Sequence, residues 1–350
     1  VEAHIKAIGR YLIGRNPFNI KHFTHVMYAD FAAKRGSMEF YSALSGIEHA
    51  MWDIVGKALG APVYKLLGGA CRDRIRVYAN YWYLGAKTPD EFAQKAIETV
   101  EAGFTALKFD PFPGPWRRFI TRDAERRAVE TVKLIRDAVG PDVDLLIEVH
   151  RRLAPMHAVR VAREMEPLDP FWYEEPVSPE NLAALAEIRR QVNIPIVTGE
   201  ALYTKFGFRE VFEQGAADII NPDACNVGGL LELKEIAAMA EPYHVAVSPH
   251  NYNSTTLGLA ATIQAAACMP NFLITEYFVP FKARGDEIAI EPFAVEGGAI
   301  RLPDKPGLGI ELNEGILSKY PYREFPPRTI PYPEQEALGP VDFERWYPTK

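Results

Sequence analysis

Apolar residues recur at helical spacing over about the first sixty positions of the chain. The clearest run is Ala43 to Leu59, where apolar side chains stand at positions 44, 47, 51, 54, 55, 58 and 59. Gly68 and Gly69 come next, and paired glycines are typical of a break between elements. We therefore expect residues 1–74 to form a helical segment distinct from the rest of the chain.

From residue 75 the pattern changes to short β-rich runs that alternate with amphipathic helical stretches. Asp123–Val139 is a clear helical stretch, because its apolar residues share one face and Gly140 comes next as a stop. The β-rich runs are Ile75–Asn80, Ala106–Asp110, Leu145–His150, Phe171–Glu175, Ile196–Glu200, Ile219–Asp223, Val245–His250 and Leu273–Tyr277. Eight strands alternating with seven helices predict an α/β fold, a (β/α)7β barrel of the TIM type, over residues 75–280.

Residues 281–350 lack this alternation and are rich in Pro and Gly. We expect an irregular tail that packs back on the N-terminal helices. The longest apolar stretch, Leu257–Met269, is too short to span a bilayer. The chain begins without an initiator Met or a signal peptide, so we expect either a fragment or a chain whose earlier residues were removed or not observed, and a soluble, cytoplasmic protein.

Charge and cysteine content exclude several classes of partner and site. The net charge is −7 and no run of Lys or Arg occurs, which argues against a nucleic-acid or membrane partner. Cys71, Cys225 and Cys268 are odd in number and form no Cys-x-x-Cys pair. Neither a disulfide framework nor a cysteine zinc site is therefore predicted.

The ends of three consecutive predicted strands carry a glutamate. Active sites of parallel barrels lie at the C-terminal ends of the strands, and Glu148, Glu174 and Glu200 succeed one another at steps of 26 residues. Equal steps should bring the carboxylates to one height, where they repel and raise each other's pKa values. A hard divalent cation removes that conflict, and oxygen ligands favour Mg²⁺, with Mn²⁺ as an alternative, over zinc. Rim ion pairs are the alternative, but no basic residues match this spacing.

Two histidines close predicted strands near these glutamates. Asp223 and His250 end adjacent strands, and a carboxylate bound to one imidazole nitrogen makes the other nitrogen more basic, which suits a general base. His150 lies two residues after Glu148 and should share its inward face, as a second acid or base. A buried structural role is the alternative for each histidine.

Further polar residues close the remaining strands. Lys108 could bind a substrate carboxylate or pair with the nearby acids, and Asp110 repeats the same two-residue step. Glu175 points to the opposite face from Glu174 and is expected either to be structural or to hold a neighbouring ligand in place. Candidate substrate contacts are Asp110, Asn80 and Asn226, with Tyr81 and Asn251 beside them.

Taken together, these strand ends resemble those of the enolase superfamily, mandelate racemase subgroup. The resemblance rests on Lys108-Phe109-Asp110, Glu148-Val149-His150, Glu174-Glu175-Pro176, Gly199-Glu200, Pro222-Asp223-Ala224 and His250. It implies an α+β capping domain, of which residues 1–74 and the tail are parts and whose first strands precede Val1. It also implies a homo-oligomer.

The segment Glu148 to Pro155 looks most like the acid-sugar dehydratases, such as galactonate, gluconate and mannonate dehydratases. That resemblance implies Mg²⁺-dependent removal of the proton α to a carboxylate, an enediolate, and loss of the 3-hydroxyl to give a 2-keto-3-deoxy acid. His250 with Asp223 would be the base and His150 the acid. Glu276 would hydrogen-bond the substrate carboxylate, with help from Lys108.

Two departures from the subgroup's pattern matter. Glu148 stands where aspartate is common, which changes the reach of the first ligand. Asp110 stands where racemases have the second lysine of Lys-x-Lys, which argues against a two-base racemase. A cycloisomerase or lactonising enzyme, or an epimerase, acting on a sugar acid or anhydro-sugar acid remains the main alternative. A non-catalytic member and a metal hydrolase rank lower, the latter because no His-x-His occurs.

Overall fold

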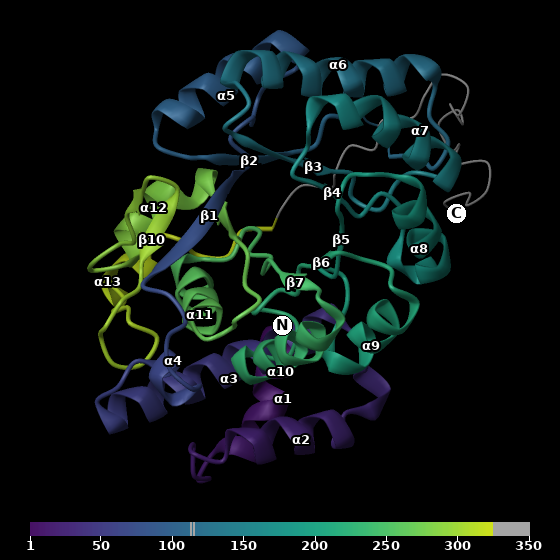
Figure 1. Cartoon of the computed structure of the whole chain (residues 1–350). Helices are drawn as coiled ribbons and strands as arrows, with labels where there is room; N and C mark the ends of the chain where they lie inside the picture. The colour runs from purple at the N-terminus through teal and green to yellow at the C-terminus, as the bar shows by residue number, and fades with distance from the viewer. Residues whose placement is uncertain (113, 115, 325–350) are drawn as a thin grey trace, which may run out of the picture.

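The computed structural model describes residues 1–112, 114 and 116–324. Its N-terminal part is helical, as predicted, and lies at the lower end of the molecule in Figure 1. The helices are α1 (Glu2–Leu12), α2 (Ile20–Asp30), η1 (Ala32–Lys34), α3 (Met38–Leu59) and α4 (Val63–Leu66). The Ser37 hydroxyl accepts from Phe40 N at 3.3 Å at the start of α3, and Gly60 ends the helix at φ 63°. Ile8, Met27 and Met51 are buried where these helices meet.

Eight parallel strands come next and close into a barrel, which confirms the predicted fold class (Figure 1). They are β1 (Arg74–Asn80), β2 (Ala106–Phe109), β3 (Asp144–Glu148), β4 (Trp172–Glu174), β5 (Ile196–Thr198), β6 (Ile219–Ile220), β7 (Ala246–Val247) and β8 (Thr275–Phe278). Each of β1 to β6 pairs with the next strand, and β8 pairs with β1. A parallel bridge from Val247 to Phe272 completes the ring.

Seven α-helices connect the eight strands along the chain, as the periodicity predicts. They are α5 (Pro89–Glu101), α6 (Arg122–Val139), α7 (Pro155–Met165), α8 (Leu182–Gln191), α9 (Thr204–Gln214), α10 (Leu230–Ala240) and α11 (Thr256–Ala267). Short 3₁₀ helices adjoin three of them, at η2 (Glu166–Leu168), η3 (Pro179–Asn181) and η4 (Glu241–Tyr243), and η5 (Val279–Phe281) follows β8. Among the described residues, no helix is long and apolar enough to cross a membrane.

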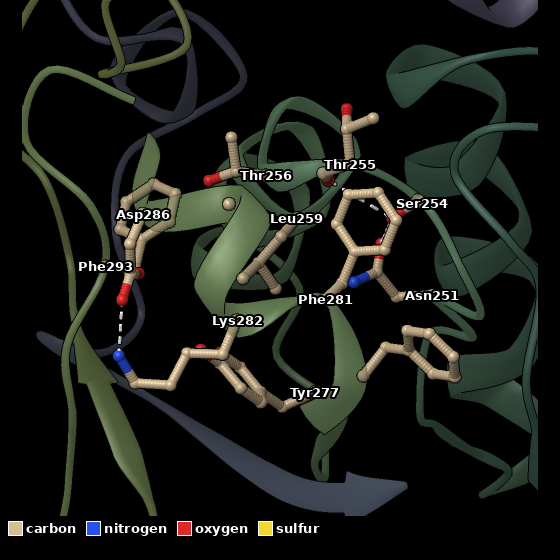
Figure 2. A pocket seen from close by; sticks show the side chains of 12 residues that line it. Asn251, Ser254, Thr255, Thr256, Leu259, Tyr277, Phe281, Lys282, Asp286 and Phe293 are labelled. Atoms are coloured by element: carbon tan, nitrogen blue, oxygen red, sulfur yellow. Dashed lines mark hydrogen bonds and ion pairs between the residues drawn. The ribbon is translucent and has the colours of Figure 1, made fainter. Parts of the chain in front are cut away.

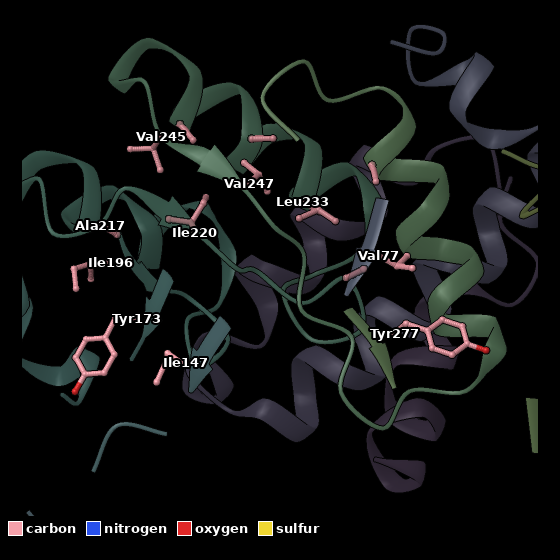
Figure 3. Close-up of a cluster of buried hydrophobic side chains, with 14 of the residues drawn as sticks. Val77, Ile147, Tyr173, Ile196, Ala217, Ile220, Leu233, Val245, Val247 and Tyr277 are labelled. Carbon is pink, nitrogen blue, oxygen red and sulfur yellow. The ribbon is translucent and has the colours of Figure 1, made fainter. Parts of the chain in front are cut away.

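Alternate strand residues fill two different cores. One set points outward to the helices, as Figure 3 shows for Val77, Ile147 and Val247. The other set fills the barrel interior and is formed by Tyr78, Ala106, Leu146, Trp172, Val197, Ile219 and Ile274. Because strand side chains alternate, the residue two positions beyond an interior residue also faces inward. Glu148 and Glu174 therefore lie directly above Leu146 and Trp172.

Several strands end earlier than the sequence pattern suggests. The predicted third strand ran to His150, but β3 ends at Glu148 and His150 has φ 53°. The predicted fourth strand ran to Glu175, which has φ 42°. A positive φ takes the chain out of the extended conformation, so these residues turn over the mouth of the barrel. The period of two therefore does not describe His150.

The C-terminal part is more ordered than predicted. It forms α12 (Lys282–Ile288), β9 (Val295–Glu296), β10 (Ala299–Arg301) and α13 (Glu314–Leu317). Strand β10 pairs antiparallel with β1, which the Pro- and Gly-rich composition did not indicate. Beyond it, Val63 N donates to Gly307 O at 2.9 Å and Leu308 N to Asp53 Oδ1 at 2.9 Å. This part of the tail thus contacts α3 and α4; residues 325–350 lie outside the described chain, and the domain boundaries stay a prediction.

Candidate active site

The three glutamates converge at the mouth of the barrel. Glu148 and Glu174 are paired in register on β3 and β4, whereas Glu200 lies two residues past the end of β5. Gly199 makes the turn between them at φ 141°, and a Cβ there would lie 2.7 Å from a Phe208 ring carbon. One carboxylate oxygen from each glutamate lies within 4.8 Å of the others. The expected convergence is present, although the third ligand reaches it through a turn.

The carboxylates have unused acceptor atoms inside the protein. Oε2 of Glu148 and Oε2 of Glu174 are buried and accept no hydrogen bond from any described residue. Lys108 Nζ lies 2.9 Å from Glu174 Oε1 and 3.3 Å from Glu148 Oε2, the latter as an ion pair without hydrogen-bond geometry. Burial and the neighbouring Glu148 raise the pKa of Glu174 well above its usual range. Despite burial, His150 and Lys108 lower the pKa of Glu148. His250 likewise lowers that of Glu200, so among the three glutamates the expected rise occurs only at Glu174. An all-oxygen donor set with buried oxygens that accept no hydrogen bond from the described residues fits a hard divalent cation.

Arg151 lies over the third glutamate. Its guanidinium donates to both Glu175 and Glu200. Glu175 also accepts from Thr198 Oγ1 at 2.9 Å and from Gly199 N at 3.2 Å, so protein groups engage both of its oxygens. This arrangement is consistent with the structural role expected for Glu175. Arg151 was not predicted from the sequence, because its φ of 63° folds the loop back over the barrel.

Asn221 connects two of the glutamates and was also missed. Its amide nitrogen donates to Glu174 Oε1 at 2.7 Å, and its amide oxygen accepts from Glu200 N at 3.1 Å. The side chain is buried. A usable signal existed, because Asn221 lies two residues before Asp223 at the end of a predicted strand.

His250 and Asp223 form the expected pair. His250 Nδ1 lies 2.7 Å from Asp223 Oδ2, and Asp223 Oδ1 accepts from Cys225 N at 2.7 Å. The other imidazole nitrogen, Nε2, lies 3.2 Å from Glu200 Oε2 and 3.5 Å from Glu276 Oε2. Burial disfavours the imidazolium, but Glu276, Glu200 and Asp223 outweigh it and raise the pKa of His250 to about 10. Nε2 therefore faces the carboxylate cluster.

Glu276 is fixed by its neighbours on β1 and after β7. The Asn80 amide donates to Glu276 Oε1, and Asn251 N donates to Glu276 Oε2 at 2.9 Å. Lys108 Nζ lies 4.0 Å from Glu276 Oε1. The Asn80 oxygen accepts from Tyr81 N at 2.7 Å, so protein groups already engage this predicted substrate contact on both sides.

Asn226 is a predicted substrate contact whose side chain still has a hydrogen-bond acceptor without a donor in the described part of the chain. Its side-chain oxygen is buried and has no hydrogen-bond partner among the described residues. Its backbone N–H donates to Asp223 O at 3.1 Å, which places it in the same loop as the aspartate that binds His250. Whether it binds substrate stays a prediction.

His150 and Asp110 form a second pair that the sequence did not join. His150 Nδ1 lies 2.8 Å from Asp110 Oδ2, and Arg152 donates to the same oxygen. Asp110 Oδ1 accepts from Phe112 N at 2.9 Å, so both oxygens of this predicted substrate contact have protein partners. Burial opposes the charge on His150, but Glu148 and then Asp110 raise its pKa.

The loop after β6 is attached to the N-terminal helices. From α3, His49 Nε2 lies 3.0 Å from Ala224 O and Ser45 Oγ accepts from Gly228 N at 3.0 Å. The buried carboxylate of Glu48 accepts from Leu230 N at 2.9 Å and from Leu231 N at 3.0 Å, the first N–H groups of α10. Helix α3 therefore fixes the segment that begins at Asp223.

A pocket adjoins the site on the β8 side. Figure 2 shows it between the loop after β7, strand β8 and helix α12, with Phe281 and Phe293 among its apolar residues and the Lys282–Asp286 ion pair at its edge. Its lining includes Asn251, which contacts Glu276, but none of the three convergent glutamates. The chemistry therefore lies beside this pocket, in the barrel mouth.

Comparisons with known proteins cover almost all of the described chain. Residues 91–316 match the family model described as enolase C-terminal domain-like, and residues 1–68 match the N-terminal domain of mandelate racemase and muconate lactonizing enzyme. A D-gluconate dehydratase from Thermoproteus tenax is 39% identical over 322 residues, which are 91% of this chain and 64% of the relative. This chain thus spans less than two thirds of that relative's length.

Another relative and two solved structures are similar over more than four fifths of their own length. A D-gluconate/D-galactonate dehydratase from Picrophilus torridus is 36% identical over 92% of this chain and 82% of its own length. A solved mandelate racemase/muconate lactonizing enzyme from Sulfitobacter superposes with a TM-score of 0.86 at 35% identity, covering 92% of this chain and 84% of that one. A solved enolase superfamily member from Salmonella Typhimurium has a TM-score of 0.86 at 32% identity, covering 91% and 86%.

Proposed function

We propose that this chain is a hydro-lyase that converts a sugar acid to a 2-keto-3-deoxy acid. The chain belongs to the mandelate racemase/muconate lactonizing enzyme group of the enolase superfamily. One observation carries the proposal: two His–Asp pairs flank three convergent glutamates. Their histidines come after β3 and β7, four strands apart in a ring of eight and hence on opposite sides. Relatives named as gluconate, galactonate and xylonate dehydratases support the substrate class.

Glu148, Glu174 and Glu200 would hold one Mg²⁺, with Mn²⁺ as an alternative. The buried oxygens of the first two that accept no hydrogen bond from the described residues support this assignment. When bound, the cation supplies positive charge that stabilises the negative charge a substrate carboxylate gains as its α-proton leaves.

His250 is the base of the proposed reaction. Its Nδ1 is held by Asp223 and its Nε2 faces the carboxylate cluster, so Nε2 is the atom that receives the α-proton when the imidazole is neutral. Glu276 and Lys108 lie at the inner end of the site. Lys108 would donate to the substrate carboxylate, and Glu276 would bind that carboxylate through a shared proton.

His150 is the acid on the opposite side. With Nδ1 held by Asp110, Nε2 is free to give a proton to the 3-hydroxyl as the bond from C3 to oxygen breaks. The electron pair of the α C–H bond forms the new C2–C3 double bond, and the hydroxyl leaves as water. The resulting enol tautomerises to the 2-keto-3-deoxy acid, so no oxidant or reductant is needed.

Product analysis tests this proposal directly. The Mg²⁺-loaded protein is incubated with a panel of aldonates and aldarates, and 2-keto acids are trapped and quantified. We expect a keto acid from at least one member, and none after Glu174→Gln. Isomerisation of a lactone, an anhydro acid or an epimer without any keto acid would replace the dehydratase with the isomerase alternative. No α-proton exchange in D₂O with any member would instead support a non-catalytic protein.

A further inference from the structure

Trp116 is a half-exposed aromatic side chain at the edge of the candidate site. It lies between β2 and α6 and is 51% exposed. Its indole stacks on the His150 imidazole, with ring centroids 5.0 Å apart and planes at 19°. The Arg152 guanidinium carbon lies 4.6 Å from the indole centroid. The ring therefore lies over both the proposed acid and the arginine that shares Asp110.

The groups beneath the indole are firmly held. Arg152 is buried, and besides Asp110 it donates to Val149 O at 2.8 Å and to Phe112 O at 3.1 Å. The chain just after Trp116 is attached to the barrel, because Ala154 N donates to Arg118 O at 2.8 Å. The indole thus presents an apolar surface at a defined place beside the acid.

Another aromatic residue of the same loop has a different environment. Phe119 is 71% exposed, and its ring meets His157 edge-on with centroids 6.2 Å apart. His157 bonds to the buried Glu125 at 2.6 Å, within the contact between α6 and α7. An exposed aromatic residue alone therefore indicates nothing about this loop; the contact with His150 distinguishes Trp116.

We propose that Trp116 is a substrate-binding residue whose exposed surface packs on the C–H groups of carbons beyond C3, and that it favours sugar acids of five or six carbons. This inference rests on the proposed function, because that function assigns His150 to the 3-hydroxyl. A group stacked on His150 then lies next to the part of the chain that continues past C3. Carbon-bound hydrogens of a sugar acid carry no donor or acceptor, so an aromatic face is a suitable partner for them.

Chain length is the variable that tests this contact. A four-carbon acid ends one carbon after C3 and offers almost nothing to the indole, whereas a six-carbon acid offers three further carbons. A residue that acted only by orienting His150 would affect all lengths equally. The dependence of the Trp116 effect on chain length therefore separates contact with substrate from an effect on the acid.

The experiment uses Trp116→Ala and Trp116→Phe, with Phe119→Ala as the matched control from the same loop. Dissociation constants of four-, five- and six-carbon aldonates are measured by calorimetry on Mg²⁺-loaded proteins that also carry His250→Asn, which prevents turnover. We expect Trp116→Ala to weaken the six-carbon acids about tenfold, the factor that one aromatic contact supplies. The four-carbon acid should change less than twofold, Trp116→Phe should be intermediate, and Phe119→Ala should match the parent.

An equal loss at every chain length, no loss at all, or no binding by any of the acids would overturn the inference. Keto-acid formation by the otherwise unchanged protein is scored separately. Length-dependent binding without any keto acid would remove the proposed dehydration and leave Trp116 as a sugar-acid contact. Keto-acid formation with no effect of the Trp116 substitutions on binding would support the dehydration and remove Trp116 as a substrate contact.

Discussion

The same pair of side chains occurs twice in the mouth of the barrel, in different surroundings. Both histidines hold an aspartate through Nδ1, at 2.7 Å for His250 and 2.8 Å for His150. Around His250 the nearest charged groups besides Asp223 are the carboxylates of Glu200 and Glu276. His150 instead shares its aspartate with Arg152 and lies against an indole; its side chain is 22% exposed, against 12% for His250.

This difference shows how one residue pair can serve two purposes. An aspartate that serves only an imidazole stabilises the imidazolium and favours a base. Arg152 offsets part of the negative charge of Asp110, so Asp110 stabilises the imidazolium of His150 less than it would without the arginine, although Glu148 still raises the pKa of His150. The surroundings of each pair therefore fit the proposed division into base and acid.

The substitution with the largest expected effect removes a ligand of the proposed cation site, which lies between the two His–Asp pairs. Glu174→Gln takes away the central glutamate, so Mg²⁺ binding measured by calorimetry should be lost. Both α-proton exchange and keto-acid formation should fall by more than about 10³-fold, because several kcal/mol of charge stabilisation disappear. The exposed Glu187→Gln on α8 is the control. Near-normal turnover in Glu174→Gln would contradict the cation assignment.

Replacing each histidine by asparagine should affect α-proton exchange and elimination differently. Loss of His250 should reduce both α-proton exchange and elimination by roughly 10²–10⁴-fold, since the base acts first. Loss of His150 should reduce elimination by a similar factor while exchange in D₂O, followed by NMR, persists. Equal losses of exchange and elimination in both variants would show that the two pairs do not have separate roles.

Two adjacent arginines provide a finer comparison. Arg151 binds the third glutamate, so Arg151→Gln should weaken Mg²⁺ binding roughly 10–100-fold, as removal of a group that orients a ligand does. Arg152 binds Asp110 instead, so Arg152→Gln should leave Mg²⁺ affinity within about twofold and lower elimination. Calorimetry measures the first effect and product formation the second. The same response from both variants would contradict this assignment.

The last prediction concerns how stability depends on pH through His49, the α3 residue that contacts the loop next to Asp223. Burial lowers the pKa of His49 to about 4, below the ordinary 6.5, so the folded state binds fewer protons between these values. The stability from His49 is therefore complete above pH 6.5 and lost as the pH falls toward 4. At pH 4.5 the loss is about 2–3 kcal/mol.

Urea unfolding at pH 7 and pH 4.5 compares His49→Gln with the original protein. The glutamine amide can still donate toward Ala224 O, and the variant should lose less stability than the original on acidification. Glu48 contributes with the opposite sign, because burial raises its pKa to about 7, but this contribution is present in both proteins and cancels. An identical pH dependence in both would mean that His49 titrates normally.

Much of the barrel and the central acidic cluster could be predicted from the sequence. The alternation of two periodicities reports which face of each element is buried, and the steps between Glu148, Glu174 and Glu200 result from equal βα units. Trp116, Arg151 and the bond from His150 to Asp110 were not predicted. These features depend on loop residues at positive φ and on contacts between different loops, which no local period encodes. Asn221 is an exception, since its strand-end position was visible in the sequence.

The attachment of α3 to the loop after β6 limits how this protein can be divided or recombined. The Glu48 carboxylate satisfies the first two N–H groups of α10, and Ser45 satisfies Gly228 N. A barrel expressed without α3 would lose these acceptors and leave the N–H groups to water, at a cost of about 0.5–1.5 kcal/mol for each hydrogen bond lost. Chimaeras that exchange the N-terminal helices between relatives should therefore transfer Ser45, Glu48 and His49 together with residues 224–231 as one unit.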